Sequence, residues 1–209
     1  MRDLPDSTGR PVLALADLTD AAGTWARLCR WLHAGATTPT HTFRWPVVST
    51  TSADGTPEVR VVVLRRFDEP TRTLVFHTDV RSAKVAELKR HPHCGFLFHD
   101  PDDRIQLRLR TSATLHHADD FARREYATLP PFNRATYSAV TPPGVPLAPD
   151  APFDYPPKPP ADDEVAFRHF LAVACVVQTA DALELHPSGH RRAKFEWTAG
   201  GVRMTRVGA

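Results

Sequence analysis

The stretch RVVVLRRFDEPTRTLVFHTDVRSAK, residues 60–84, decides the fold because it joins two strand-like runs to the charged start of a helix. Residues 60–65 are rich in β-branched side chains, and residues 73–78 are predicted to form the next strand. Residues 81–90 are predicted to form a short helix that Pro92 ends. The chain is therefore predicted to run strand, strand, helix through this stretch.

The first turn of that helix combines Arg81, Ser82 and Lys84. A helix N-terminus presents unpaired amides and a partial positive charge, so a serine hydroxyl and two cations beside it indicate a site for a phosphate dianion. The alternative is that Ser82 only caps the helix while both cations point into solvent. The residue types alone leave both interpretations open.

Further runs rich in β-branched and aromatic residues extend the pattern in both directions. Strands are predicted over residues 46–52, 57–67, 94–99, 104–116, 167–179, 182–186, 191–198 and 202–206. Asp54-Gly55 and Gly200-Gly201 supply residues suited to tight hairpin turns. The run 104–116 alternates, with one apolar face formed by Ile105, Leu107 and Leu109 and one polar face formed by Gln106, Arg108 and Arg110. It is predicted to be a long strand with one solvent-exposed face.

Helices are predicted where apolar residues recur at helical spacing, over residues 17–34, 119–129 and 131–138. A polar residue near the start is expected to cap the first two: Asp17 or Thr19, and Asp119 or Asp120.

Residues 139–163 are predicted to form a long proline-rich loop, because eleven prolines lie between residues 130 and 160. Two groups of antiparallel strands with short helices between them favour a single α+β domain over residues 1–209, built around a β-barrel.

The composition, with 42% hydrophobic and 24% charged residues, is that of a soluble globular protein. A net charge of +2 argues against nucleic acid as a partner. No run approaches the roughly 20 apolar residues of a membrane helix, and the first ten residues lack an apolar core, so a cytoplasmic location is expected. Cys29, Cys94 and Cys175 are expected to be buried thiols, and no metal site is expected.

Three motifs taken together resemble the flavin mononucleotide (FMN) site of the pyridoxamine 5′-phosphate oxidase superfamily: RVVVLR at 60–65, HTDxRSxK at 77–84 and IQLRL at 105–109. The resemblance covers residues 43–114 and, more loosely, residues 184–195. It implies an antiparallel split β-barrel with peripheral helices and FMN as the cofactor. Among the branches of the superfamily, the chain is most similar to the general FMN-binding, oxidase-related one.

The resemblance also implies roles for individual residues. Those implied to bind FMN are Arg60, Val61, Val62, Val63, Leu64, His77, Thr78, Arg81, Ser82, Lys84, Gln106 and Lys194. Arg60, Ser82 and Lys84 would meet the phosphate, and the backbone of residues 61–64 would lie against the ring. Gln106 would reach the ring or the ribityl chain, although a lone glutamine in a strand is also compatible with simple solvation.

On the substrate side, the resemblance implies Arg65, Tyr126, Arg134 and Arg191. Arg65 stands where the vitamin-pathway enzymes have a lysine, and the Arg and Ser that complete their phosphate clamp fall on Pro130 and Arg134. Each missing charge-assisted hydrogen bond costs about 1.5–3 kcal/mol, so oxidation of pyridoxamine phosphate itself is not expected. Arg134 is also compatible with a solvated helix position.

The predicted function is an FMN-dependent oxidoreductase that transfers a hydride between a small organic donor or a nicotinamide and the flavin. The alternatives are a noncatalytic FMN-binding or flavin-sequestering protein and, less favoured, haem binding in the same barrel. The functional unit is predicted to be a homodimer with FMN at the subunit interface, in which Arg191 and Lys194 are supplied by the second chain.

Overall fold

The computed structural model describes residue 15 and residues 18–151, 163–185 and 189–209. Within them the chain forms one antiparallel sheet with helices beside it, which confirms the α+β class. The helices are α1 (Ala21–Thr37), α2 (Ala83–Arg90), α3 (Asp120–Ala127), α4 (Pro131–Arg134) and α5 (Asp163–His169), with 3-10 turns at Thr42–Arg44 and Ala135–Ser138. The strands are β1 (Val47–Thr51), β2 (Pro57–Val61), β3 (Arg66–Asp68), β4 (Thr73–Asp79), β5 (His93–Asp100), β6 (Ile105–His116), β7 (Phe170–Glu184), β8 (Arg191–Thr198) and β9 (Gly201–Arg206).

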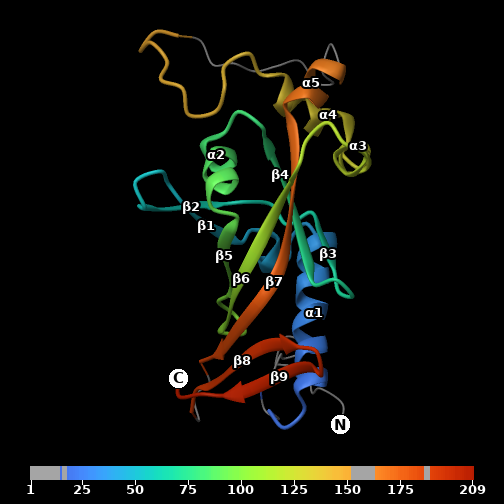
Figure 1. The fold of residues 1–209 in the computed structure, drawn as a ribbon, viewed down its shortest axis with the longest axis vertical. Coiled ribbons are helices and arrows are strands. Elements are labelled where there is room, and N and C mark those ends of the chain that lie inside the picture. The colour runs from blue at the N-terminus through green and yellow to red at the C-terminus, as the bar shows by residue number, and fades with distance from the viewer. Residues whose placement is uncertain (1–14, 16–17, 152–162, 186–188) are drawn as a thin grey trace.

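The long strands β6 and β7 run along the long axis of the molecule (Figure 1). The sheet order is β2-β1-β5-β6-β7-β4-β3, and the hairpin β8-β9 joins β7 beyond the part that β4 covers. Helices α3, α4 and α5 lie at one end of β7, and β8 and β9 lie at the other (Figure 1). The two ends of the sheet therefore carry different parts of the chain.

The sheet curls because its two edge strands are joined by a short link. Strand β2 ends at Val61 and β3 begins at Arg66, so the predicted strand over residues 57–67 is wrong in its second half. A link of this length spans at most about 18 Å, even when fully extended. The edges must therefore approach each other, although the sheet is not closed, and the predicted split barrel is confirmed.

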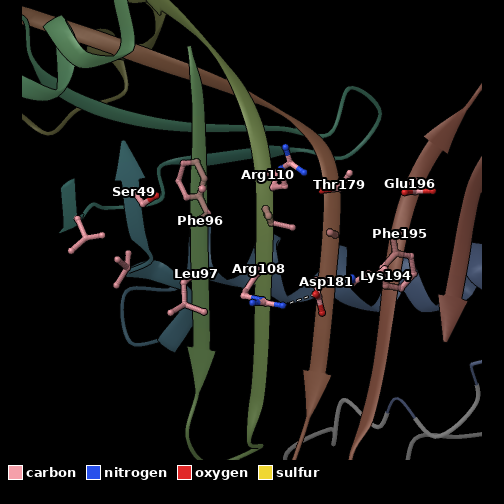
Figure 2. A pocket seen from close by; sticks show the side chains of 15 residues that line it. Ser49, Phe96, Leu97, Arg108, Arg110, Thr179, Asp181, Lys194, Phe195 and Glu196 are labelled. Carbon is pink, nitrogen blue, oxygen red and sulfur yellow. Dashed lines mark hydrogen bonds and ion pairs between the residues drawn. The ribbon is translucent and has the colours of Figure 1, made fainter. Parts of the chain in front are cut away.

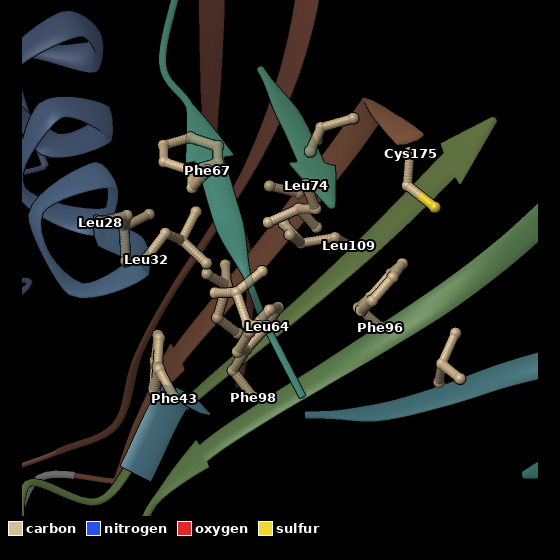
Figure 3. Packing of buried hydrophobic residues seen from close by; sticks show 14 of the residues in the cluster. Leu28, Leu32, Phe43, Leu64, Phe67, Leu74, Phe96, Phe98, Leu109 and Cys175 are labelled. Atoms are coloured by element: carbon tan, nitrogen blue, oxygen red, sulfur yellow. The ribbon is translucent and has the colours of Figure 1, made fainter. Parts of the chain in front are cut away.

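The main core fills the inside of this curled sheet. Leu28 and Leu32 of α1 are fully buried in a cluster with Phe43, Leu64 and Phe67 (Figure 3). Helix α1 begins four residues later than predicted for residues 17–34, with Asp20 at its N-cap position. Thr19 is therefore not the cap residue, and the other expected cap, Asp17, lies outside the described residues.

A second, smaller core lies between β7 and helices α3 and α5. Its members Ala166 and Phe167 are the buried residues of α5, and Phe170 follows them at the start of β7. The predicted strand start at residue 167 is therefore wrong, because β7 begins at Phe170.

The separate strand predicted over residues 182–186 is instead the end of β7, which runs without a break to Glu184. The other predicted elements are confirmed within one to three residues at each end. Both hairpin turns place a glycine at positive φ, 88° at Gly55 and 108° at Gly201. Asp119 caps α3 by accepting from the Ala122 amide at 2.7 Å. The described part of the proline-rich loop, residues 139–151, contains no helix or strand, and residues 152–162 and His186 lie outside the described residues.

Candidate functional site

Four predicted FMN-binding residues come together at the start of α2. Lys84 Nζ donates to the Thr78 hydroxyl at 3.1 Å, and the hydroxyls of Thr78 and Ser82 are 3.0 Å apart. Arg60 reaches the same place from β2, close enough for its charge to act on Lys84. We call Arg60, Thr78, Ser82 and Lys84 the cationic half-site.

Arg60 is held in place by a buried carboxylate on α2. Its Nη2 lies 3.1 Å from Glu87 Oε2, and the Thr50 hydroxyl donates to the same oxygen while accepting from Arg60. Glu87 is buried, so its charge requires such partners. Strand β1, strand β2 and helix α2 are thereby joined under the guanidinium of Arg60.

The two cations of the cationic half-site lie close enough to repel each other. Burial, and then the nearby Arg60, lower the pKa of Lys84, whereas Glu87 and Asp79 act in the opposite direction. A bound anion would relieve the repulsion between the two cations. Two cations and two hydroxyls are the donors that a phosphate group accepts, so these residues fit the phosphate end of FMN.

Ser82 and Arg81 make other contacts than the sequence suggested. Ser82 occupies the N-cap position of α2, but its hydroxyl donates to the Asp79 carbonyl at 2.8 Å instead of accepting from an amide of the helix. Arg81 forms an ion pair with Asp79 at 2.7 Å and donates to the carbonyls of Ala139 and Val140. Arg81 thus joins the start of the proline-rich loop to the turn before α2.

His77 and Thr78 are neighbours whose side chains point to opposite faces of β4, as strand geometry requires. Only 1% of the His77 side chain is exposed, and its Nε2 is 3.2 Å from Glu125 Oε2 of α3. Its Nδ1 is buried with no hydrogen-bond partner among the described residues. Burial lowers the pKa of His77, and Glu125 partly offsets this. The His77 side chain therefore faces helix α3, on the side of β4 opposite Thr78.

The backbone of residues 61–64 is only partly available for a ligand. The Val62 amide donates to the Pro46 carbonyl at 3.0 Å, and the Leu64 amide donates to the Arg44 carbonyl at 2.9 Å. The side chains of Val62 and Leu64 are buried in the core, as expected. Val61 is the opposite case, because its side chain is exposed on the edge strand.

Gln106, Lys194 and Arg191 lie at the other end of the sheet. Gln106 pairs with Leu183 of β7, and β8 continues that part of the sheet with Arg191 and Lys194. Arg191 is 3.4 Å from the buried carboxylate of Glu184. Two residues further along β6, Arg108 pairs with Asp181 of β7, which pairs in turn with Lys194 of β8. Arg108 forms an ion pair with Asp181 at 2.6 Å.

This end of the sheet borders a groove of about 600 Å³ on the solvent-exposed face (Figure 2). Its lining combines charged side chains of β6, β7 and β8 with apolar ones of β1, β2 and β5, among them Arg108, Asp181, Lys194, Val47, Val59 and Leu97. Arg108 and Arg110 are exposed, whereas Ile105, Leu107 and Leu109 are buried, so the predicted alternation of β6 is confirmed.

Within one chain, the cationic half-site and Gln106 lie too far apart to bind the same small molecule. Thr78 of the cationic half-site pairs with Leu171 of β7, whereas Gln106 pairs with Leu183. At about 3.3 Å per residue, about 40 Å of strand separates the two rows. FMN, a tricyclic ring joined to one phosphate by a five-carbon chain, is far shorter than this.

Three of the four predicted substrate residues lie around Phe170, whose ring packs on both Tyr126 and Tyr137. Arg134 Cζ is 4.9 Å from the centre of the Tyr126 ring. Arg65 lies beside Tyr137, and its Nε is buried with no partner among the described residues. Burial raises the pKa of Tyr137 to about 12, and Arg65 opposes this. Arg191 is at the far end of the sheet.

Three carboxylates that organise these sites were not predicted. A signal existed for Glu87, because it lies between Val85 and Leu88 on the buried face of α2, where a charge needs a partner. No comparable signal marked Glu125 and Asp163, since their partners come from distant parts of the chain.

A curled antiparallel sheet with two cations and two hydroxyls at a helix start is a split barrel with donors that suit a phosphate group. Residues 24–117 match the family described as "Pyridoxamine 5'-phosphate oxidase, FMN-binding domain". The predicted resemblance to the pyridoxamine 5′-phosphate oxidase superfamily is thereby confirmed, and the cofactor that this domain indicates is FMN.

Curated relatives carry the name pyridoxine/pyridoxamine 5′-phosphate oxidase. The protein of Caulobacter vibrioides is 34% identical over 110 residues, which cover 53% of this chain and 46% of that protein. The protein of Nitrobacter hamburgensis is 32% identical over 114 residues, covering 54% and 53%. The chain thus spans about half the length of the curated relatives it matches.

Solved structures show the same fold over most of the chain. A pyridoxamine 5′-phosphate oxidase-related, FMN-binding protein of Nostoc punctiforme aligns with a TM-score of 0.69 and 21% identity, covering 88% of this chain and 96% of that one. PhzG of Burkholderia lata, solved with tetrahydrophenazine-1-carboxylic acid, aligns with a TM-score of 0.67 and 14% identity, covering 88% and 92%. At these identities the likeness concerns the fold.

Two features are absent from the described residues. None of the helices there is long and apolar enough to cross a membrane. In the same part of the chain, no group of three histidine, cysteine, aspartate or glutamate side chains is arranged to hold a metal ion. The three cysteines are buried and form no disulfide.

Proposed function

We propose that this protein is an FMN-dependent oxidoreductase. The observation that carries the proposal is the cationic half-site, where Arg60 and Lys84 repel each other beside two hydroxyls and so favour a phosphate. The family match to an FMN-binding domain supports the same cofactor. FMN, when bound, supplies the redox chemistry by accepting a hydride on its ring and passing electrons to an acceptor.

The protein's own residues bind and orient the cofactor. Arg60 and Lys84 neutralise the phosphate, and the hydroxyls of Thr78 and Ser82 turn from their hydrogen bonds within the chain to donate to it. Glu87 fixes the guanidinium of Arg60 in advance, so less ordering is required when FMN binds. The Thr78 side chain faces the phosphate, whereas His77 holds α3 against the back of β4.

The functional unit in this proposal is a homodimer in which each FMN lies between two chains. The cationic half-site and Gln106 are separated by about 40 Å along β7, which supports this arrangement. A second copy can bring its own Gln106 and Lys194 to the first chain's half-site. On the edge strand β2, Val59 is 65% exposed and Val61 is 58% exposed. A second copy would cover these side chains.

The test is anaerobic photometric reduction of the FMN-loaded protein with NADH, NADPH and pyridoxamine 5′-phosphate, followed by admission of oxygen. We expect a nicotinamide or another small donor to bleach the flavin in a saturable manner and pyridoxamine phosphate to do so poorly. If no donor reduces the bound flavin while dithionite does, the protein is a noncatalytic FMN-binding protein and the proposed activity is wrong.

A further inference from the structure

A second group of anion-binding side chains lies beside the small core at the other face of β4. The Tyr126 hydroxyl donates to Asp163 Oδ1 at 2.7 Å, and Arg134 Nη1 donates to Asp163 Oδ2 at 3.0 Å. Both oxygens of one carboxylate are thus bound by two different donors. We call Tyr126, Arg134 and Asp163 the Asp163 cluster.

The donors of this cluster are held by contacts that do not involve Asp163. Arg134 Nε donates to the Leu129 carbonyl at 3.1 Å, Nη2 donates to the Ala127 carbonyl at 3.3 Å, and the guanidinium stacks on the Tyr126 ring. The Tyr126 ring in turn packs on Phe170 at 5.2 Å between centroids. The two donors would therefore stay in position if the carboxylate were removed.

The carboxylate is more exposed than the cation that binds it. Asp163 is 53% exposed in its side chain, whereas Arg134 is 22% exposed. Solvent, and any anion in it, reaches the cluster from the carboxylate side. The cluster is also close to strand β4, because the Phe170 ring contacts both the Tyr126 ring and the His77 ring. His77 precedes Thr78 of the cationic half-site on that strand.

We infer that Asp163 is a specificity-determining residue that occupies an anion subsite with the chain's own carboxylate. A substrate that docks against this cluster finds both donors taken and meets a negative charge. Phosphate esters and carboxylates are therefore disfavoured at this position, and the substrate is uncharged or cationic at the end that faces Tyr126. This inference rests on the proposed function, and it takes the substrate to approach the flavin from the His77 side of β4.

The test compares pyridoxine 5′-phosphate with pyridoxine as ligands of the FMN-loaded protein, using the change in flavin fluorescence. Asp163→Ala should improve the preference for the phosphorylated ligand by about tenfold or more, because one charge-assisted hydrogen bond is worth at least about that factor. Adding Arg134→Ala to this variant should abolish the gain.

Glu164→Ala is the matched control, since it removes the same charge from the next residue of α5 and should leave the preference unchanged. An equal gain in Glu164→Ala would show a general charge effect and overturn the inference, as would an unchanged preference in Asp163→Ala. If Asp163→Ala fails to fold, Asp163→Asn removes the charge and retains an acceptor, and should give a smaller gain in the same direction. The readout is binding without turnover, so a protein that is never reduced by any donor refutes the proposed activity and leaves this test intact.

Discussion

The cationic half-site and the Asp163 cluster both combine arginine with hydroxyl donors, but the chain's own carboxylates pair with Arg60 alone in the first and with both donors in the second. Glu87 reaches Arg60, whereas Lys84, Ser82 and Thr78 bind no carboxylate among the described residues. Asp163 instead binds both donors of its cluster. The same residue types therefore form a site for an external anion in one place and an internally occupied site in the other.

The largest expected effect concerns the assembly, because the cationic half-site is proposed to be completed by a second chain and the Asp163 cluster is complete in one. Replacing Val59 and Val61 together by Lys should weaken the dimer by at least about 1000-fold, since unpaired charges would be buried in the interface. Sedimentation velocity with and without FMN measures this. A wild-type monomer that holds stoichiometric FMN at micromolar concentration would refute the shared site.

The second effect would break the comparison directly. Lys84→Ala should weaken FMN by about 100-fold, because one or two charge-assisted hydrogen bonds to the phosphate are lost, and riboflavin by less than about threefold. Lys89→Ala, on the exposed side of the same helix, is the control and should change neither. Titration of the apoprotein with both flavins is the measurement. Equal losses for FMN and riboflavin would contradict the phosphate assignment.

A third effect concerns Glu125, which joins helix α3 to strand β4. Tyr126 follows Glu125 on the helix, and Thr78 follows its partner His77 on the strand. The Glu125 carboxylate binds Arg66 at 2.8 Å and His77 at 3.2 Å and is largely buried. Glu125→Ala should lower the free energy of unfolding by about 2 kcal/mol, a value reduced for the partly exposed Arg66. Glu196→Ala, which removes an exposed ion pair with Arg203, should cost less than about 0.5 kcal/mol. Urea unfolding compares the two.

The smallest effect is a pH dependence that arises from His77. Burial lowers its folded-state pKa below the ordinary value of 6.5, so the unfolded chain takes up this proton first as the pH falls. The free energy of unfolding is therefore highest above pH 6.5 and falls below it, by at most about 1.4 kcal/mol per pH unit, until the folded-state pKa is reached. His77→Asn should flatten the unfolding free energy over this range. A wild-type profile that rises as the pH drops below 6.5 would contradict the sign.

Secondary structure and the cofactor motif were largely predictable because their signals are local. The alternation of residues 104–116, the Asp54-Gly55 turn and the start of α2 each depend on neighbours within a few positions. The link between β2 and β3 was not predictable. After Val61 the chain passes from one edge of the sheet to the other, and where it pairs there depends on the position of Val75 in a later strand. A run of β-branched residues does not encode that partner.

By itself, the sequence determined an antiparallel α+β fold, a buried and a solvent-exposed face of β6, and a cationic turn whose donors suit a phosphate. The tertiary structure decided which of the implied residues meet. It turned His77 to the back of β4, placed Gln106 about 40 Å along β7 from Thr78, and brought Asp163 onto Tyr126 and Arg134. Side-chain direction in a strand has a period of two residues and is local, whereas pairing between distant strands and helices depends on the whole packing arrangement. The chemistry of each group could therefore be predicted from the sequence, whereas its partner could be identified only from the fold.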